Sequence, residues 1–293
     1  MKQLIIKNTQ SEFDACARSI RVPQGKRREM NSTAAGGFSF VLFCLILLSG
    51  YQNAEGADPR KAAEQGDAEA QYKLGNMYVK GDGVKRDRKQ AAEWFRKAAN
   101  QNHAKSQVIL GGMYLIGTGV KQDETQAVAW FRKAAEQGDA TGQLLLGSFF
   151  FDKQDYTQAE KWLRKAAEHG NADSQLKLGV MYEDGKGVKQ DQKQAVEWYR
   201  KGAKQGDADS QLRLGVMYED GKGVKQDQKQ AVEWYRKGAE QGDANAQAKL
   251  GVMYALGKGV GQDQKQAVEW FRKAAKQGHV LAKQLLKKLG KLP

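Results

Sequence analysis

The stretch GKGVKQDQKQAVEWYRK occupies residues 185–201 and recurs unchanged at 221–237, and a near copy, GKGVGQDQKQAVEWFRK, follows at 257–273. Its Gly-Lys-Gly could form a phosphate-binding loop or a hinge between two helices. A phosphate loop connects a strand to a helix, whereas the residues on both sides of this stretch repeat with helical periodicity. The lysine also varies, to Asp82 in the first copy and Thr118 in the second. We therefore interpret the stretch as a hinge inside a repeated building block.

The repeat has a period of 36 residues, which is typical of helical arrays. The six tryptophans are separated by 36, 32, 36, 36 and 36 residues. This spacing predicts six helix-turn-helix units of about 36 residues, the third shortened to 32. Each unit contains a first helix, a short loop and a second helix. The units begin near Ala68, Ala104, Ala140, Ala172, Ala208 and Ala244.

Helix boundaries can be assigned from single residues in each unit. Asp191, with Gln194 three residues later, predicts a capping box at the start of the second helix. Gly206 predicts a left-handed residue after that helix, and Asp207 then caps the next first helix. Gly179 inside the first helix costs about 1 kcal/mol relative to alanine. We expect this cost because a bulky aromatic side chain must approach the backbone there.

A unit reading AxxQxxLGxMYxxGxGV, followed by DxxQAxxW and then by R-K, resembles the Sel-one-like repeat (SLR), a relative of the tetratricopeptide repeat. The resemblance covers roughly residues 60–290. It implies an all-α protein, a right-handed α-solenoid of six units, to which we add a C-terminal capping helix. It also implies a non-enzymatic scaffold that binds another protein or peptide on the concave face of the first helices. Secreted bacterial members are linked to envelope functions or host-cell contact. We expect a monomer.

The N-terminal region contains an apolar run, FSFVLFCLILL, at residues 38–48. The run is too short for a bilayer span, which needs about 20 residues, but it suits a secretory signal cleaved after Gly56. The start codon can be Met1 or Met30. We expect export across the inner membrane to the periplasm or beyond, or inner-membrane anchoring if the signal stays uncleaved. The chain then divides into an upstream extension or long signal n-region at 1–29, a signal peptide at 30–56 and the solenoid at 57–293.

The repeats offer little material for catalysis or for metal binding. Cys16 and Cys44 both precede them, so the repeats contain no disulfide and no thiolate site. Ser174 and Lys177 match the Ser-x-x-Lys of penicillin-binding enzymes, but the companion motifs are absent. We expect no catalytic residue, no metal and no cofactor. A cell-wall or penicillin-type hydrolase related to secreted cysteine-rich repeat proteins remains the alternative. The histidines fall separately at turns between units: His103, His169 and His279.

The net charge of +14 raises the question of nucleic-acid binding. Residues 258–293 carry nine basic and two acidic residues, a balance of +7, so half of the charge lies at one end. A continuous basic track along the array is therefore absent, and we expect no nucleic-acid partner. A helical-repeat RNA binder stays open as a second alternative, although it requires basic or polar readout positions in every unit.

Candidate binding residues lie where the units differ, at positions two, six, nine and thirteen of each first helix, which share one stripe. Units two and three are apolar where other units are charged, and exposed apolar clusters often mark binding sites. The alternative is that Ile109, Ile116 and Leu145 pack between adjacent helices. The candidates are Lys73, Lys105, Ile109, Ile116, Leu145, Lys177 and Arg213.

A second candidate surface is a basic patch at the C-terminal end of the array. We expect its lysines to form the solvated outer face of a capping half-unit, as terminal repeats require. Contact with an anionic membrane or an envelope polymer is the alternative. The patch consists of Lys283, Lys287, Lys288 and Lys291.

Overall fold

The computed structural model describes residues 59–290. The predicted extension at 1–29, the signal at 30–56 and Lys291 lie outside the described residues. The described part is entirely helical, with fourteen helices and no strand. The helices are α4 Arg60–Glu64, α5 Ala68–Lys80, α6 Arg88–Asn100, α7 Ala104–Ile116, α8 Glu124–Glu136, α9 Ala140–Asp152, α10 Tyr156–Glu168, α11 Ala172–Asp184, α12 Gln192–Lys204, α13 Ala208–Asp220, α14 Gln228–Glu240, α15 Ala244–Leu256, α16 Gln264–Lys276 and α17 Val280–Lys288.

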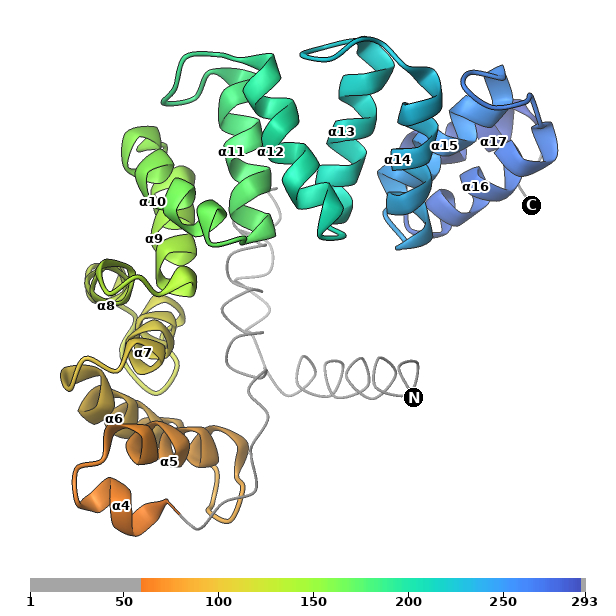
Figure 1. Cartoon of the computed structure of the whole chain (residues 1–293). Coiled ribbons are helices and arrows are strands. Elements are labelled where there is room, and N and C mark those ends of the chain that lie inside the picture. Colours follow the sequence, from red (N-terminus) through yellow and green to blue (C-terminus); the bar gives the residue numbers. More distant parts are fainter. Residues whose placement is uncertain (1–58, 291–293) are drawn as a thin grey trace. The chain divides into compact units, whose positions relative to one another are not determined.

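The helices stack in chain order as six pairs, α5/α6 to α15/α16 (Figure 1). The two helices of each pair pack against each other, and the second helix of each pair also packs against the first helix of the next. This neighbour-to-neighbour packing defines an α-solenoid and confirms the predicted six-unit array. Helix α17 packs on α16, as expected for a cap at the C-terminal end.

One short helix, α4, precedes the first pair and was not expected from the repeat pattern. Its sequence, RKAAEQGD at residues 60–67, recurs at 132–139, where it ends a second helix. Pro59 stands where second helices carry an aromatic residue, and proline suits the first turn of a helix. The side chain of Gln71 donates to the carbonyl of Ala63 at 3.1 Å, as the equivalent glutamines do between later units. Helix α4 thus corresponds to the last turn of a second helix.

The glycine inside each first helix faces the side chain that follows the tryptophan in its own unit. A Cβ added to Gly179 would lie 2.3 Å from Cε1 of Tyr199, a distance that real side chains do not tolerate. Phenylalanine or tyrosine plays this role in every unit except the third, where Gly147 faces Leu163. The predicted reason for the costly glycine is confirmed.

The repeated Gly-Lys-Gly connects two helices, so it is the predicted hinge. Gly185 has a φ of 71°, which favours glycine. At Gly223 a Cβ would lie 2.1 Å from the carbonyl oxygen of Gln192, so this loop also rests on the preceding unit. The third unit lacks the loop, and only residues 153–155 join its two helices, with Gln154 at a φ of 62°.

Helix ends follow the capping residues that the sequence predicted, with one difference. A side-chain oxygen of Asp191 accepts from the backbone N–H groups of Lys193 and Gln194 at 2.9 and 3.1 Å. The backbone N–H of Asp191 donates to the carbonyl of Tyr182 at 2.9 Å. The predicted capping box is therefore wrong in its reciprocal half, because the Gln194 side chain is not the partner of that N–H. Gly206 is left-handed, at a φ of 92°, as expected.

A buried glutamine at the fourth position of each first helix links neighbouring units. Gln175 donates through Nε2 to the carbonyl of Ala167 in the preceding unit at 3.0 Å. Its Oε1 accepts from Nε2 of Gln205 at 2.6 Å. In the third unit, Nδ1 of His169 takes over this role, 3.1 Å from Oε1 of Gln143. These bonds satisfy polar groups that would otherwise be costly to bury.

Candidate functional site

The predicted binding residues separate into exposed and buried groups. We call the surface formed by positions two, six, nine, twelve and thirteen of the first helices the first-helix face. Of the seven candidates on it, Lys73, Lys105 and Arg213 are exposed, Lys177 and Ile116 are half-buried, and Ile109 and Leu145 are buried.

Two residues of the apolar stripe of units two and three, Ile109 and Leu145, therefore belong to the interior. Ile109 is only 5% exposed and Leu145 only 1%. Ile109 lies in one core cluster with Phe95 and Leu110. For this pair the structure supports the alternative of packing between helices, so neither side chain lies open on the first-helix face.

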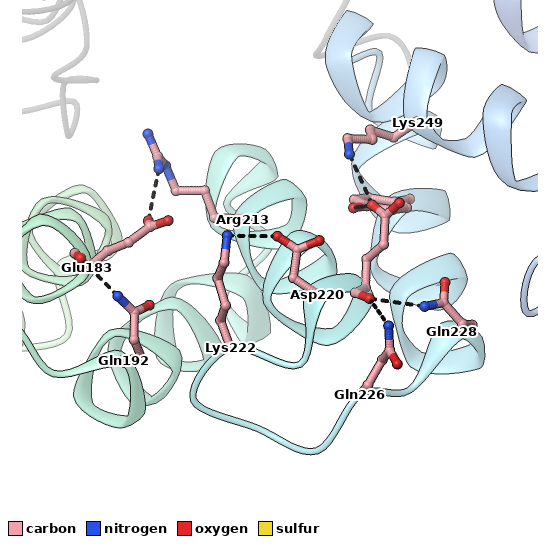
Figure 2. Close-up of polar contacts among 10 residues, drawn as sticks. Glu183, Gln192, Arg213, Asp220, Lys222, Gln226, Gln228 and Lys249 are labelled. Atoms are coloured by element: carbon pink, nitrogen blue, oxygen red, sulfur yellow. Dashed lines mark hydrogen bonds and ion pairs between the residues drawn. The ribbon is translucent and has the colours of Figure 1, made fainter.

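A seam between consecutive units explains why this pair is apolar. Each seam has three members. The first is the residue at position twelve of a first helix, and the second is the residue after the tryptophan in the second helix of the same unit. The third is the residue at position six of the next first helix. Between units four and five, the hydroxyl of Tyr199 donates to Oε2 of Glu183 at 2.5 Å. Nη1 of Arg213 lies 3.1 Å from the same oxygen (Figure 2). The seam is therefore a three-membered polar contact across two units.

The next seam repeats this arrangement with lysine in place of arginine. The hydroxyl of Tyr235 donates to Oε2 of Glu219 at 2.5 Å. Nζ of Lys249 lies 3.0 Å from the same oxygen (Figure 2). Both cations come from the unit that follows the carboxylate, so each ion pair connects two units.

Four seams remain. In one of them only position twelve is apolar: Phe151 faces Lys177, whose Nζ lies 5.5 Å from the ring centroid of Phe151. In the other three seams, positions twelve and six are both apolar. These triplets are Val79, Phe95 and Ile109; Leu115, Phe131 and Leu145; and Ala255, Phe271 and Leu285.

The pKa values of two residues of this polar seam are raised. Burial raises the pKa of Tyr199, and the hydrogen bond to Glu183 raises it further, although Arg213 opposes the shift. The tyrosine therefore stays protonated and remains the donor. Burial lowers the pKa of Arg213, but Tyr199 and Glu183 outweigh that effect and raise it. Arg213 therefore stays protonated and remains the cation of the seam.

At position two, at the start of the first helices, units four and five carry the acidic side chains Asp173 and Asp209. Burial raises the pKa of Asp173, and Asp207 adds to the shift while Lys177 opposes it. Burial likewise raises the pKa of Asp209, together with Asp207 and Asp243. Neither carboxyl group forms an ion pair in the described part of the chain.

The lysines predicted at the C-terminal end lie on α17 and are exposed: Lys283, Lys287 and Lys288. Lys291 is outside the described residues. Within residues 59–290, no carboxylate forms an ion pair with these three lysines.

The serine that matched the Ser-x-x-Lys pattern lies inside the array. Ser174 is fully buried, so its hydroxyl is not available to a substrate. In the described part of the chain, no group of three or more histidine, cysteine or acidic residues is placed to hold a metal ion. No helix between residues 59 and 290 is long and apolar enough to cross a bilayer.

These features define a tetratricopeptide-like helical repeat protein, in which recurring residues stack the units and variable ones line a shared face. The Sel1 repeat family matches residues 68–103, 104–139, 141–171, 172–207, 208–243 and 244–279. The chain belongs to the Sel1 repeat family, whose members generally serve as non-enzymatic scaffolds for protein–protein interaction.

Two solved structures show how far the similarity extends. One is c5321, a protective antigen present in uropathogenic Escherichia coli strains, with 37% identity and a TM-score of 0.77. The match covers 92% of this chain, which spans only 59% of that protein. The other is a Sel1 repeat protein from Oxalobacter formigenes, with 39% identity and a TM-score of 0.65 over 72% of this chain and 89% of that one. None of the curated proteins compared with the chain is similar enough to count as a relative.

Proposed function

We propose that this protein is a non-enzymatic scaffold that holds another protein or a peptide against the first-helix face. The observation that carries the proposal is the division between recurring and varying residues. Glutamine at position four and glycine at position eight occur in all six units, where they stack the helices. Position two changes from Glu69 to Lys105, Thr141, Asp173, Asp209 and Asn245. Residues that the stacking does not require are free to serve recognition.

The charges indicate what the partner brings to this face. Arg213 and Lys249 are already paired with carboxylates of the preceding unit. Asp173 and Asp209 form no ion pair within residues 59–290, and burial raises the pKa of both carboxyl groups. A basic side chain placed beside them by a partner would form a charge-assisted hydrogen bond. We expect Lys177, Lys105, Lys73 and Ile116 to line the same surface.

Export is part of the proposal. The apolar run at residues 38–48 and the small residues up to Gly56 support a cleaved signal. Similarity to a protective antigen of uropathogenic E. coli supports a role in the envelope or in host contact. Mass spectrometry of the mature protein tests this step: an N-terminus at Ala57 is expected. An intact N-terminal segment in the membrane fraction would instead indicate an anchor.

The binding claim is tested by crosslinked capture from envelope and host-surface extracts, with residues 57–293 as bait. The described helices belong to one compact unit, and circular dichroism checks that the bait is helical. A second bait carries Asp173→Asn and Asp209→Asn on the first-helix face. The matched control carries Glu197→Gln and Glu233→Gln, which remove two exposed charges from second helices.

The expected result is a protein captured by the wild type and the control but lost by the first-helix variant. The affinity of the purified pair should then fall about tenfold or more in the variant, as for a lost charge-assisted contact. Equal capture by all three baits would place binding elsewhere on the molecule. No specific capture by any bait would contradict the scaffold proposal.

A further inference from the structure

Exposed apolar side chains are concentrated at one end of the array. Within residues 59–290, the large apolar residues that are exposed are Leu256 at 57%, Val280 at 67%, Leu281 at 49% and Leu289 at 43%. Three of these four belong to α17 or follow it directly. Isolated exposed leucines are ordinary. Here, however, units one to five contain no exposed large apolar side chain within the described residues.

The geometry of α17 places these side chains beside lysines. Ala282 and Leu286 are buried against the preceding unit and fix the inner side of the helix. At 100° per residue, implied by 3.6 residues per turn, the opposite side spans about 160°. That outer side carries Val280, Leu281, Lys283, Lys287 and Lys288, which we call the terminal patch.

A further repeat cannot cover the terminal patch in the way second helices cover first helices. In α15 the contact requires Gly251, where a Cβ would lie 2.6 Å from Cε1 of Phe271. The equivalent position of α17 is Lys287. The side chain of Lys287 would occupy the place of the aromatic ring of a following second helix. The terminal patch is therefore not a surface on which another repeat could pack in the same way.

The charge of this end is unbalanced. Residues 258–293 contain nine basic and two acidic residues. The three lysines of the terminal patch form no ion pair with any carboxylate in the described part of the chain. Binding of a helix to the surface of an anionic bilayer depends on the apolar area that it can bury there and on the attraction of its cations to the lipids, and the terminal patch offers both.

We propose that the terminal patch docks the protein onto an anionic lipid surface. Val280 and Leu281 enter the headgroup region, while Lys283, Lys287 and Lys288 lie against the lipid phosphates. The terminal patch contains none of the residues proposed above to contact the protein partner, so the two proposals are tested by different variants. The array would then be held at a membrane by its end while the first-helix face stays open.

Partitioning onto vesicles tests the proposal, with residues 57–293 so that the apolar run at 38–48 cannot bind in its place. The vesicles contain equal parts of phosphatidylglycerol and phosphatidylcholine, and pure phosphatidylcholine serves as the neutral comparison. The wild type should bind only the anionic vesicles, and less at high salt because salt screens exposed charges.

Two variants and a matched control locate the contact. Lys283→Gln with Lys287→Gln and Lys288→Gln should weaken partitioning on the order of 100-fold, since each lysine near an anionic surface contributes about fivefold. Val280→Ser with Leu281→Ser should weaken it about tenfold or more. The control removes three exposed lysines elsewhere, by Lys189→Gln, Lys225→Gln and Lys229→Gln, and should change it less than about threefold.

The proposal is overturned if the wild type ignores anionic vesicles at low salt or if the control loses as much affinity as the patch variant. An acidic amphipathic peptide is the competing occupant. If such a peptide binds the terminal patch, and the lysine variant abolishes that binding while vesicles stay unbound, the occupant is a protein. The salt titration of the unmodified chain needs no variant, so misfolding of a mutant cannot obscure the answer.

Discussion

The seams of the first two units and those of units four and five occupy the same positions but differ in chemistry. Ile109 is buried at 5% exposure, whereas the side chain of Arg213, at the equivalent position, is 44% exposed. Leu145 and Lys249 differ in the same way. The glycine-to-ring packing is nevertheless alike on both sides. One fold thus accepts both kinds of seam, and positions six and twelve change together in all of them except the seam of Phe151 and Lys177.

The two kinds of seam are expected to contribute differently to stability. An apolar side chain contributes about 1.5–3 kcal/mol when it is fully buried. A partly exposed ion pair contributes about 0–1 kcal/mol, because water and salt screen it. We therefore expect the N-terminal units to be held together more firmly by their seams. The charged seams instead keep polar groups on the first-helix face, where recognition is proposed.

The largest effect is expected from placing a charge in the apolar seam. Leu145→Lys buries an ammonium group beside Leu115, where the charged seams offer a carboxylate. The free energy of unfolding should fall by about 3–5 kcal/mol, as for an unpaired buried charge. Chemical denaturation followed by circular dichroism measures it. Arg213→Lys is the control and should cost less than about 1 kcal/mol. Equal losses in the two variants would contradict the comparison.

A partial rescue of that variant would sharpen the comparison. Adding Leu115→Glu to Leu145→Lys restores the carboxylate of the charged seam. A coupling energy of about 1–2 kcal/mol between the two substitutions is expected from a double-mutant cycle, because the residues are neighbours. The Leu115→Glu single variant supplies the remaining corner of the cycle. Additive losses would show that the two positions do not meet.

The repeat architecture could be predicted from the sequence because it depends on residues that recur. The roles of Gly179 and of the capping aspartates can be predicted from the sequence of a single unit. The seam does not, because Glu183 and Arg213 belong to different units and are 30 residues apart. Helical periodicity says which residues share a face of one helix, and not which residues of two units meet. The available signal was the joint change at positions six and twelve.

Two other features were missed for related reasons. Helix α4 is too short for a periodicity argument, although the eight residues from its start, 60–67, repeat those at 132–139. Helical periodicity puts Gln175 on the same helix face as Leu178 and does not identify its partner. That partner, Gln205, follows the second helix of the same unit as its C-cap, and the recurrence of both residues was the only clue. The seam residues Ile109 and Leu145 look like a binding stripe until their neighbours are known.

Converting a charged seam into an apolar one should change stability only slightly. The triple variant Glu183→Leu, Tyr199→Phe and Arg213→Leu copies the seam of unit two. Replacing a partly buried ion pair by packed apolar groups is often neutral or stabilising, so we expect a free energy of unfolding within about 1 kcal/mol of the wild type. Its salt dependence should decrease, because screening acts on the ion pair. Denaturation at low and high salt measures both quantities, and a large loss of stability would show that the polar seam is required.

The smallest effect is expected at the edge of the charged seams, where Asp173 takes the position held by Thr141 in the apolar region. Burial raises the pKa of Asp173 above its ordinary value of 3.8, so its ionised form is disfavoured in the folded state. Stability that the protonated carboxyl provides is present below pH 3.8 and is lost as the pH rises through the raised pKa. Asp173→Asn cannot ionise, so it should raise the melting temperature at pH 7 and leave it nearly unchanged at pH 3. Glu197→Gln, on an exposed second-helix surface, is the control and should show no such difference. A gain of the same size at both pH values would mean that the substitution acts through packing and not through the charge.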